Sequence, residues 1–175
     1  MNNARRFFLI MGFFTFFGIV PASHALDIGA AAPAPVAVDQ DGTKVDFAEV
    51  YKKGVTLVYF YPKADTPGCT VEACEFRDGI AGFKKKGTAV IGISPDKPSA
   101  QAKFKEKYDL PFTLLADQDK AAAEAYGVYQ EKNMYGKKVM GIVRTTFVIG
   151  PDGRIEQIYN KVKAAGHASV VLEAL

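Results

Sequence analysis

Short apolar runs, separated by turn residues, predict the strands of a β-sheet. Three of these runs are almost continuously apolar and rich in β-branched and aromatic side chains, which is typical of buried strands. Two pairs of runs flank glycine-containing turns, and each pair predicts a hairpin. The three buried runs are 55–61, 88–94 and 112–116; the hairpins are 36–38 with Val45, around Gly42, and 145–149 with 155–159.

Apolar residues at helical spacing, together with capping residues, predict four helices. The first begins at Pro67, because Thr66 is a good N-cap and proline suits the first helical position. It continues to about Phe83, and Gly87 provides a stop. The other three helices are predicted over residues 99–108, 119–126 and 168–175.

The order of these elements predicts an α/β fold with a central mixed sheet, helices on both faces and an N-terminal β-hairpin. Two strand–helix crossovers, an antiparallel hairpin and a closing helix follow one another in the order of the thioredoxin fold. This likeness concerns only the order of the elements along the chain and says nothing about function. A chain of 175 residues is long enough for one domain with a sizeable core.

The first 25 residues have the layout of a cleavable export signal. Arg5 and Arg6 precede an apolar run of 14 residues, and the segment ends in the small-x-small pattern Ser23-His24-Ala25. As a helix the run would span roughly 21 Å, which is short for a bilayer core of about 30 Å. We therefore predict an export signal over 1–25, a folded domain over 26–175 and a periplasmic location. An uncleaved membrane anchor is the alternative.

Composition and charge narrow the classes of function. The formal charge is only +3, and basic and acidic residues are mixed along the chain, so nucleic-acid binding has no support. The chain contains two cysteines, Cys69 and Cys74. In an exported protein such a pair usually forms a structural disulfide, which is the first alternative to any catalytic role.

Cys69 falls in the first turn of the predicted helix, where free backbone N–H groups and the helix dipole favour a thiolate. Helical periodicity places Cys69 on the apolar face and Cys74 on a more exposed one. Five residues of helix separate their Cα atoms by roughly 8.7 Å. A disulfide needs less than about 7 Å, so the two cysteines cannot bond while the helix is intact. Local unwinding, made easier by Gly68 and Gly79, would let them react.

Two other functions of the cysteine pair, zinc binding and dithiol oxidoreduction, have less support. A zinc site is short of ligands, because His24 lies in the predicted signal and His167 is far away in the sequence. A dithiol oxidoreductase would be expected to carry C-x-x-C, whereas the spacing here is C-x₄-C.

Several residues near Cys69 are candidates for the same site. Thr66 could present its hydroxyl to an anion there, besides capping the helix, and Pro62 could shield the sulfur as well as ending the strand. Arg144 begins a buried strand and would stabilise a thiolate, although a surface charge is the alternative. We expect a plain structural position for three others: Glu72 and Arg77 on the helix surface, and His167 before the last helix.

Pro62, Thr66 and Cys69 form the pattern Pro-x-x-x-Thr-x-x-Cys. In this pattern, and in the whole stretch 66–78, the chain resembles the peroxiredoxins, and specifically the bacterioferritin-comigratory-protein (PrxQ) group. The resemblance covers residues 27–175 and extends to 92–94, 108–117, 131–138 and 144–149.

The resemblance implies a thioredoxin-like fold and reduction of hydrogen peroxide and organic hydroperoxides. Cys69 would be the peroxidatic residue, Thr66 and Arg144 would hold and polarise the peroxide, and Pro62 would shield the sulfenic acid. Cys74 would resolve that acid as an intramolecular disulfide, which a thioredoxin-like partner would reduce. The resemblance implies a monomer and no metal, haem or flavin cofactor.

Two departures from the group leave alternatives open. The lead-in Ala32-Pro33-Ala34-Pro35-Val36 differs from the usual start, and the export signal is unusual for the group, which leaves the electron donor unidentified. An exported protein thiol–disulfide oxidoreductase is the second hypothesis. An exported binding or structural module with an inert disulfide is the third.

Overall fold

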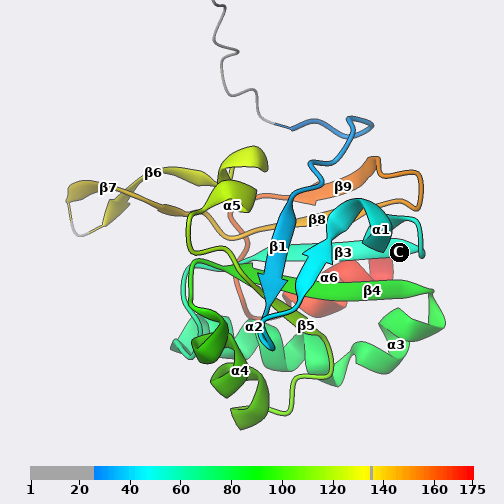
Figure 1. Cartoon of the computed structure of the whole chain (residues 1–175), viewed down its shortest axis with the longest axis horizontal. Coiled ribbons are helices and arrows are strands. Elements are labelled where there is room, and N and C mark those ends of the chain that lie inside the picture. Colours follow the sequence, from blue (N-terminus) through cyan, green and yellow to red (C-terminus); the bar gives the residue numbers. More distant parts are fainter. Residues whose placement is uncertain (1–25, 135) are drawn as a thin grey trace, which may run out of the picture.

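The fold is described by a computed structural model, which covers residues 26–134 and 136–175. Its centre is a seven-stranded mixed sheet with the strand order β2-β1-β5-β4-β3-β8-β9 (Figure 1). β3, β4 and β5 are parallel, and the other neighbours are antiparallel. The strands are β1 (Val36–Asp39), β2 (Lys44–Asp46), β3 (Val55–Phe60), β4 (Thr88–Ser94), β5 (Thr113–Ala116), β8 (Thr145–Ile149) and β9 (Ile155–Tyr159).

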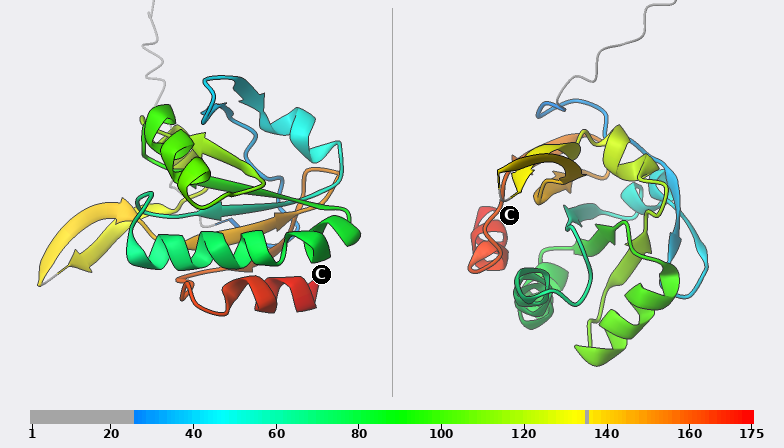
Figure 2. Two further views of the ribbon diagram at one scale, coloured as in Figure 1. Left: turned by 90° about the horizontal axis from the view of Figure 1, so that it is seen from below. Right: turned by 90° about the vertical axis from the view of Figure 1, so that its left-hand side faces the viewer.

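Helices cover both faces of the sheet, as predicted (Figure 2). One face carries four helices: α2 (Pro67–Asp78), α3 (Ile80–Lys85), α4 (Pro98–Lys107) and α6 (His167–Ala174). The other carries α1 (Phe47–Tyr51) and α5 (Ala121–Ala125). The α/β class, the mixed sheet and the N-terminal hairpin β1–β2 are therefore confirmed.

The alternation of β3 divides the core into two parts. Leu57 and Tyr59 pack beneath α2, α4 and α6, whereas Val58 and Phe60 pack beneath α1 and α5. Because successive side chains of a strand point to opposite faces, a continuously apolar run such as β3 is what a strand covered on both sides requires. All four of these side chains are almost completely buried.

The predicted single helix over 67–83 is interrupted at Gly79, so the prediction is right in helical content but wrong in continuity. α2 ends at Asp78 and α3 begins at Ile80. A Cβ atom at Gly79 would stand 3.3 Å from the Phe83 ring. The glycine therefore lets that ring lie against the backbone at the break, where it fills the core beside Phe76.

One short helix and one hairpin of two strands were not predicted. α1 is one short turn, which begins after Asp46 because that carboxylate accepts a hydrogen bond from the Ala48 N–H (2.9 Å). β6 (Tyr129–Met134) and β7 (Lys137–Ile142) form a separate two-stranded hairpin that extends away from the body (Figure 2). Most of the hairpin is exposed, so it lacks the alternation of apolar and polar residues that marks a half-buried strand.

The sheet order brings distant segments together at one edge. β8 runs antiparallel to β3, and Thr145 at its start pairs with Phe60 at the end of β3. Arg144, which precedes Thr145, therefore lies beside the point where the chain leaves β3 and enters α2.

The predicted export signal lies outside the described residues. Within the part of the chain that the structure covers, no helix is both long and apolar enough to cross a membrane.

Candidate active site

Cys69 lies in the first turn of α2 with its sulfur turned toward the sheet. Pro67 starts the helix, as predicted. The side chain of Cys69 is 2% exposed and packs in the same apolar cluster as Tyr59, Tyr61 and Ala73. The predicted position of Cys69 on the buried face of the helix is thus confirmed.

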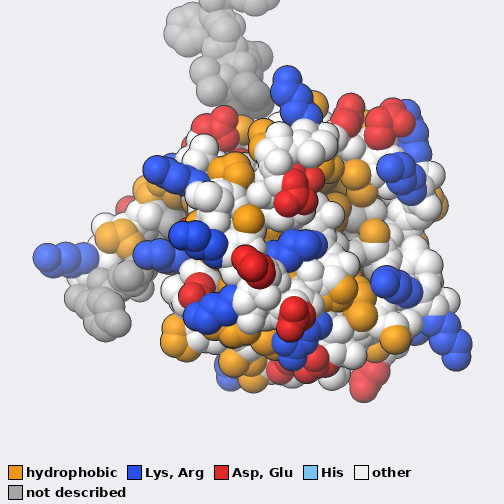
Figure 3. All heavy atoms as spheres, turned by 60° about the horizontal axis from the view of Figure 1, so that its bottom comes forward, with side chains coloured by type: hydrophobic (Ala, Val, Ile, Leu, Met, Phe, Trp, Pro, Cys, Tyr) orange, Lys and Arg blue, Asp and Glu red, His pale blue; other side chains and the backbone are white. Residues whose placement is uncertain are grey.

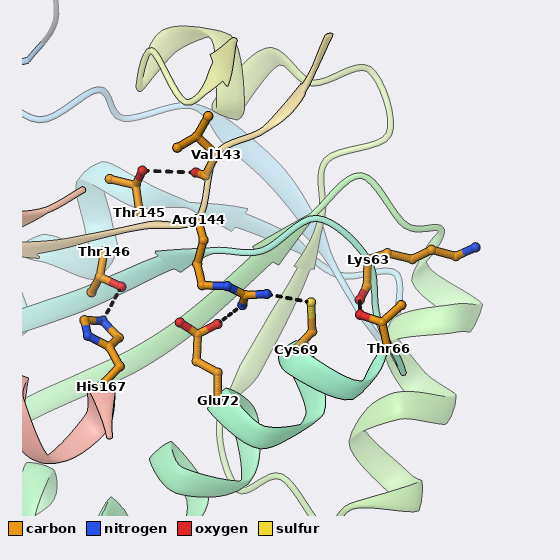
Figure 4. A network of polar contacts seen from close by, with 9 residues as sticks. All are labelled: Lys63, Thr66, Cys69, Glu72, Val143, Arg144, Thr145, Thr146 and His167. Carbon is orange, nitrogen blue, oxygen red and sulfur yellow. Dashed lines mark hydrogen bonds and ion pairs between the residues drawn. The ribbon is translucent and has the colours of Figure 1, made fainter. Parts of the chain in front are cut away.

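Arg144 reaches the sulfur of Cys69 from the start of β8 (Figure 4). Its Nη2 atom donates a hydrogen bond to Cys69 Sγ at 3.2 Å, and its Nη1 atom pairs with the Glu72 carboxylate. The backbone of Arg144 is fixed as well, because its carbonyl accepts from the Val162 N–H (3.0 Å). The guanidinium therefore lies between two acidic groups of α2, and the alternative of a surface charge is excluded by a side-chain exposure of 14%.

Glu72 corrects the expectation of a helix-surface residue. Its side chain is fully buried, and one carboxylate oxygen, Oε1, has no hydrogen-bond partner within the described residues. Glu72 lies three residues after Cys69, and side chains at this spacing share one face of a helix. That spacing was the signal in the sequence, and it was outweighed by the rarity of buried glutamates.

Burial and the neighbouring charges shift the pKa values of Glu72 and Arg144 in opposite directions. Burial raises the pKa of Glu72 to about 7, although Arg144 opposes the shift. For Arg144 burial is again the largest influence and disfavours the charge, but Glu72 and Cys69 together raise the pKa of the guanidinium. Arg144 thus keeps its charge, and a negative charge on Cys69 would lie directly against it.

Thr66 occupies the N-cap position of α2, but its side chain does not cap the helix. The hydroxyl instead donates to the Lys63 carbonyl at 2.9 Å, which closes the turn before the helix (Figure 4). The expected side-chain cap is therefore wrong, because this turn offers the hydroxyl a nearer acceptor. Thr66 remains half-buried near Cys69.

Pro62 lies on the wall of a hollow of about 570 Å³ that also reaches Arg144. Pro62 is exposed, as expected for a residue that could cover the site from outside. Its predicted role as a shield stays a prediction. The rest of the wall comes from β6, the end of β7, the link from β7 to β8 and the loop after β9: Gln130, Glu131, Lys132, Asn133, Ile142, Val143, Lys161 and Val162.

Cys74 lies later in the same helix and is half-buried. α2 is continuous from Pro67 to Asp78, and both cysteines are free thiols. An intact helix with unbonded cysteines is the arrangement that the spacing predicted. The described residues contain no group of three or more His, Cys, Asp or Glu side chains that could hold a metal ion.

His167 has the structural position expected of it. Its Nε2 atom shares a hydrogen bond with the Thr146 hydroxyl at 2.8 Å, and its ring packs edge-on against Phe76 and Tyr159. Burial lowers the pKa of His167 to about 4, so the ring is neutral at neutral pH. His167 thus joins α6 to β8 beneath α2.

Comparison with known proteins places this arrangement in a family. The sequence model of the AhpC/TSA family matches residues 28–158. Peroxiredoxin Bcp of Escherichia coli K12 is 47% identical over 152 residues, which are 87% of this chain and 97% of that protein. A putative peroxiredoxin of Mycobacterium tuberculosis H37Rv is 48% identical over 141 residues, covering 81% and 89% of the two chains.

Solved structures of peroxiredoxins of the same group have a similar fold. The bacterioferritin comigratory protein of Xanthomonas campestris superposes with a TM-score of 0.78 at 38% identity, over 85% of this chain and 94% of that chain. A mutant PrxQ of Xylella fastidiosa gives a TM-score of 0.80 at 33% identity, over 87% and 96%. These likenesses confirm the fold that the order of elements predicted.

We predict that Glu72→Gln changes the pH dependence of stability. Because the pKa of Glu72 is raised from 4.5 to about 7, the folded protein holds a proton in this interval that the unfolded chain releases. The carboxyl therefore lowers wild-type stability as the pH rises through the interval, by about 3 kcal/mol in all. Glutamine does not titrate.

Urea unfolding of both proteins between pH 4 and pH 8 measures this difference. The variant should gain stability relative to wild type as the pH rises. The titration of His167 contributes equally to the free energy of unfolding of both proteins, so it does not affect the difference between them. A difference that stays constant across the range would show that Glu72 ionises as it does in the unfolded chain.

Proposed function

Because this chain belongs to the AhpC/TSA family, as a peroxiredoxin of the Bcp/PrxQ group, we propose that its thiol peroxidase reaction begins at Cys69 and is completed by Cys74. The observation that carries the proposal is the hydrogen bond from Arg144 to the Cys69 sulfur (3.2 Å). It places a fixed positive charge at the group that must react as a thiolate.

In the first step the Cys69 thiolate attacks the terminal oxygen of the hydroperoxide. A sulfur–oxygen bond forms, the oxygen–oxygen bond breaks, and the leaving alkoxide or hydroxide takes up the proton that the thiol released. The products are a sulfenic acid and an alcohol or water. Arg144 stabilises the charge on sulfur and on the peroxide, Thr66 holds the peroxide, and Pro62 shields the sulfenic acid.

In the second step the Cys74 thiol attacks the sulfenic sulfur, and a disulfide and one water molecule are formed. The intact helix keeps the two cysteines too far apart, so α2 must unwind locally first. The break at Gly79 supports this step, because it separates the hydrogen-bonded turns of α2 from those of α3. A thioredoxin-like dithiol then reduces the disulfide and is itself oxidised.

Burial of Cys69 argues against the alternative of a protein thiol–disulfide oxidoreductase. A cysteine that is 2% exposed does not present its sulfur to a disulfide held in another folded protein. An inert structural disulfide is not supported either, because both cysteines are free.

The hollow beside Arg144 supports organic hydroperoxides as substrates in addition to hydrogen peroxide. Ile142, Val143 and Val162 are apolar residues in the lining of this hollow, to which Arg144 also contributes. An alkyl group could rest there while the peroxide group lies at Arg144. The Xanthomonas campestris relative is described as having alkyl peroxide reduction activity.

We also propose that residues 1–25 direct export to the periplasm and are removed, and that the mature protein is a monomer. The support is the arrangement of basic, apolar and small residues in the first 25 positions. An exported enzyme would need a reductant in its own compartment, which cytoplasmic thioredoxin is not.

The cysteines have separable roles, and we predict separable effects. Cys69→Ser should lower peroxide consumption by about three orders of magnitude, since the nucleophile is lost. Cys74→Ser should still form the sulfenic acid once but lose turnover supported by thioredoxin. Peroxide consumption with thioredoxin or dithiothreitol as donor measures both effects. Unchanged activity of Cys69→Ser would refute the proposal.

A comparison of two peroxide substrates tests whether the hollow beside Arg144 binds the alkyl group of an organic hydroperoxide. Val162→Ala removes two methyl groups from its wall and should lower kcat/KM for cumene hydroperoxide by about five- to tenfold. The value for hydrogen peroxide should not change, because that substrate has no alkyl group. Val170→Ala, at an exposed valine outside the hollow, is the matched control. Equal losses for both substrates would instead indicate damage around Arg144.

Native mass spectrometry of the protein from its own host tests processing and assembly together. We expect a monomer whose sequence begins at Leu26, and a loss of about 2 Da after one equivalent of peroxide, as two hydrogens leave on disulfide formation. A mass that retains residues 1–25 would contradict cleavage, and a dimer would contradict the monomer.

A further inference from the structure

The C-terminal end of α4 contacts the chain on both sides of the two cysteines. Asp65, just before α2, accepts a hydrogen bond from the Tyr108 hydroxyl (2.7 Å) and pairs with the Lys107 ammonium (2.8 Å). Arg77, near the end of α2, donates from Nη1 to the Tyr108 carbonyl at 2.9 Å. We refer to Asp65, Arg77, Lys107 and Tyr108 as the α4 clamp.

The side of the clamp on α4 is anchored in the core. The Tyr108 ring packs edge-on against the buried ring of Phe104, with 5.4 Å between the centroids, and Phe104 is 1% exposed. The Lys107 ammonium lies over the Tyr108 ring, 5.1 Å from its centroid. Deeper in α4, the Gln101 amide donates to the Leu115 carbonyl of β5 at 2.9 Å. α4 is therefore fixed to the sheet and provides a firm support for α2.

The other side of the clamp holds the turn that leads into α2. Asp65 has a φ of +55°, in the left-handed region, which aspartate adopts more easily than most residues other than glycine but less easily than the right-handed one. The pKa of Asp65 is lowered, first by Lys107 and then by Tyr108, so the carboxylate remains charged and paired. Release of Asp65 would free the turn that carries Thr66 into α2.

We infer that the α4 clamp sets the rate at which α2 unwinds, and hence the rate at which Cys74 forms the disulfide with Cys69. The inference rests on the proposed function, in which unwinding precedes that bond. Both cysteines lie between the two points of attachment, Asp65 and Arg77. Unwinding that carries Cys74 to Cys69 must therefore displace the chain next to one of these points.

The clamp would also decide the fate of the sulfenic acid. Resolution by Cys74 yields a disulfide and water. If unwinding is slow, a second hydroperoxide oxidises the sulfenic acid to a sulfinic acid and is itself reduced to an alcohol or water. A stronger clamp thus favours the sulfinic acid at high peroxide concentration, and a weaker one protects the enzyme.

The expected effect is moderate because the clamp lies at the surface. The side chains of Lys107 and Asp65 are 57% and 44% exposed. Positive and negative side chains are intermixed on the surface of the molecule that Figure 3 shows. Contacts of this kind contribute little individually, so loss of one should accelerate resolution by about three- to tenfold.

Two variants of the clamp test the inference. Tyr108→Phe removes only the hydroxyl that binds Asp65, and Lys107→Ala removes the ion pair. Lys103→Ala is the matched control, because Lys103 is an exposed lysine of α4 with no side-chain hydrogen bond among the described residues. Arg77 is left unchanged, because it lies on α2 only three residues after Cys74.

The chain contains no tryptophan, so the states of the cysteines are followed by rapid acid quenching, alkylation and mass measurement. Both clamp variants should form the disulfide three- to tenfold faster than wild type in the first-order step. Their second-order rate of sulfenic acid formation should match wild type, and their sulfinic acid yield at high peroxide should fall by a similar factor. Lys103→Ala should behave as wild type.

The outcomes separate the two proposals. If wild type forms no disulfide on addition of peroxide, the proposed function fails. If wild type forms it and the clamp variants resolve at the wild-type rate, the clamp inference fails alone. A fall in the second-order step would also overturn the inference, because the clamp would then position the site for attack on peroxide.

Discussion

A buried guanidinium must be paired, and the site depends on this requirement. Arg144 is 14% exposed and is flanked by the Glu72 carboxylate and the Cys69 sulfur. Removal of one partner from a buried ion pair leaves an uncompensated charge, which is strongly destabilising. Glu72 supplies a partner that does not depend on the chemical state of the sulfur, so Arg144 stays paired as long as α2 is intact.

The sheet order makes this contact possible. Cys69 and Glu72 follow the carboxyl end of β3, and Arg144 precedes β8, 75 residues after Cys69. Because β8 runs antiparallel to β3, its beginning meets the end of β3. A parallel β8 would place Arg144 at the opposite edge of the sheet. The antiparallel pairing, more than any local signal, therefore brings the charge to the sulfur.

Residue type and periodicity predicted those parts of the structure in which a residue's type indicates whether it is buried or exposed. The apolar run of β3, Pro67 at the helix start and the place of Cys69 on the buried face all follow from residue type and periodicity. Glu72 was misplaced because a glutamate is normally exposed, and its buried partner is distant in the sequence. The Thr66 hydroxyl and the break at Gly79 depend on short-range contacts, with the Lys63 carbonyl and the Phe83 ring, whose geometry residue type alone does not reveal.

The site consists of a fixed part and a part that the proposed cycle must move. Arg144 is held by its backbone at the start of β8, whereas Cys69, Glu72 and Cys74 are carried by α2. Glu72 lies between the two cysteines, so unwinding that joins them also displaces the carboxylate from Arg144. Protonation lowers the cost of that separation, and burial has raised the pKa of Glu72 to about 7, where a proton is readily available. The burial that makes Glu72 a costly anion thus also makes α2 easier to release.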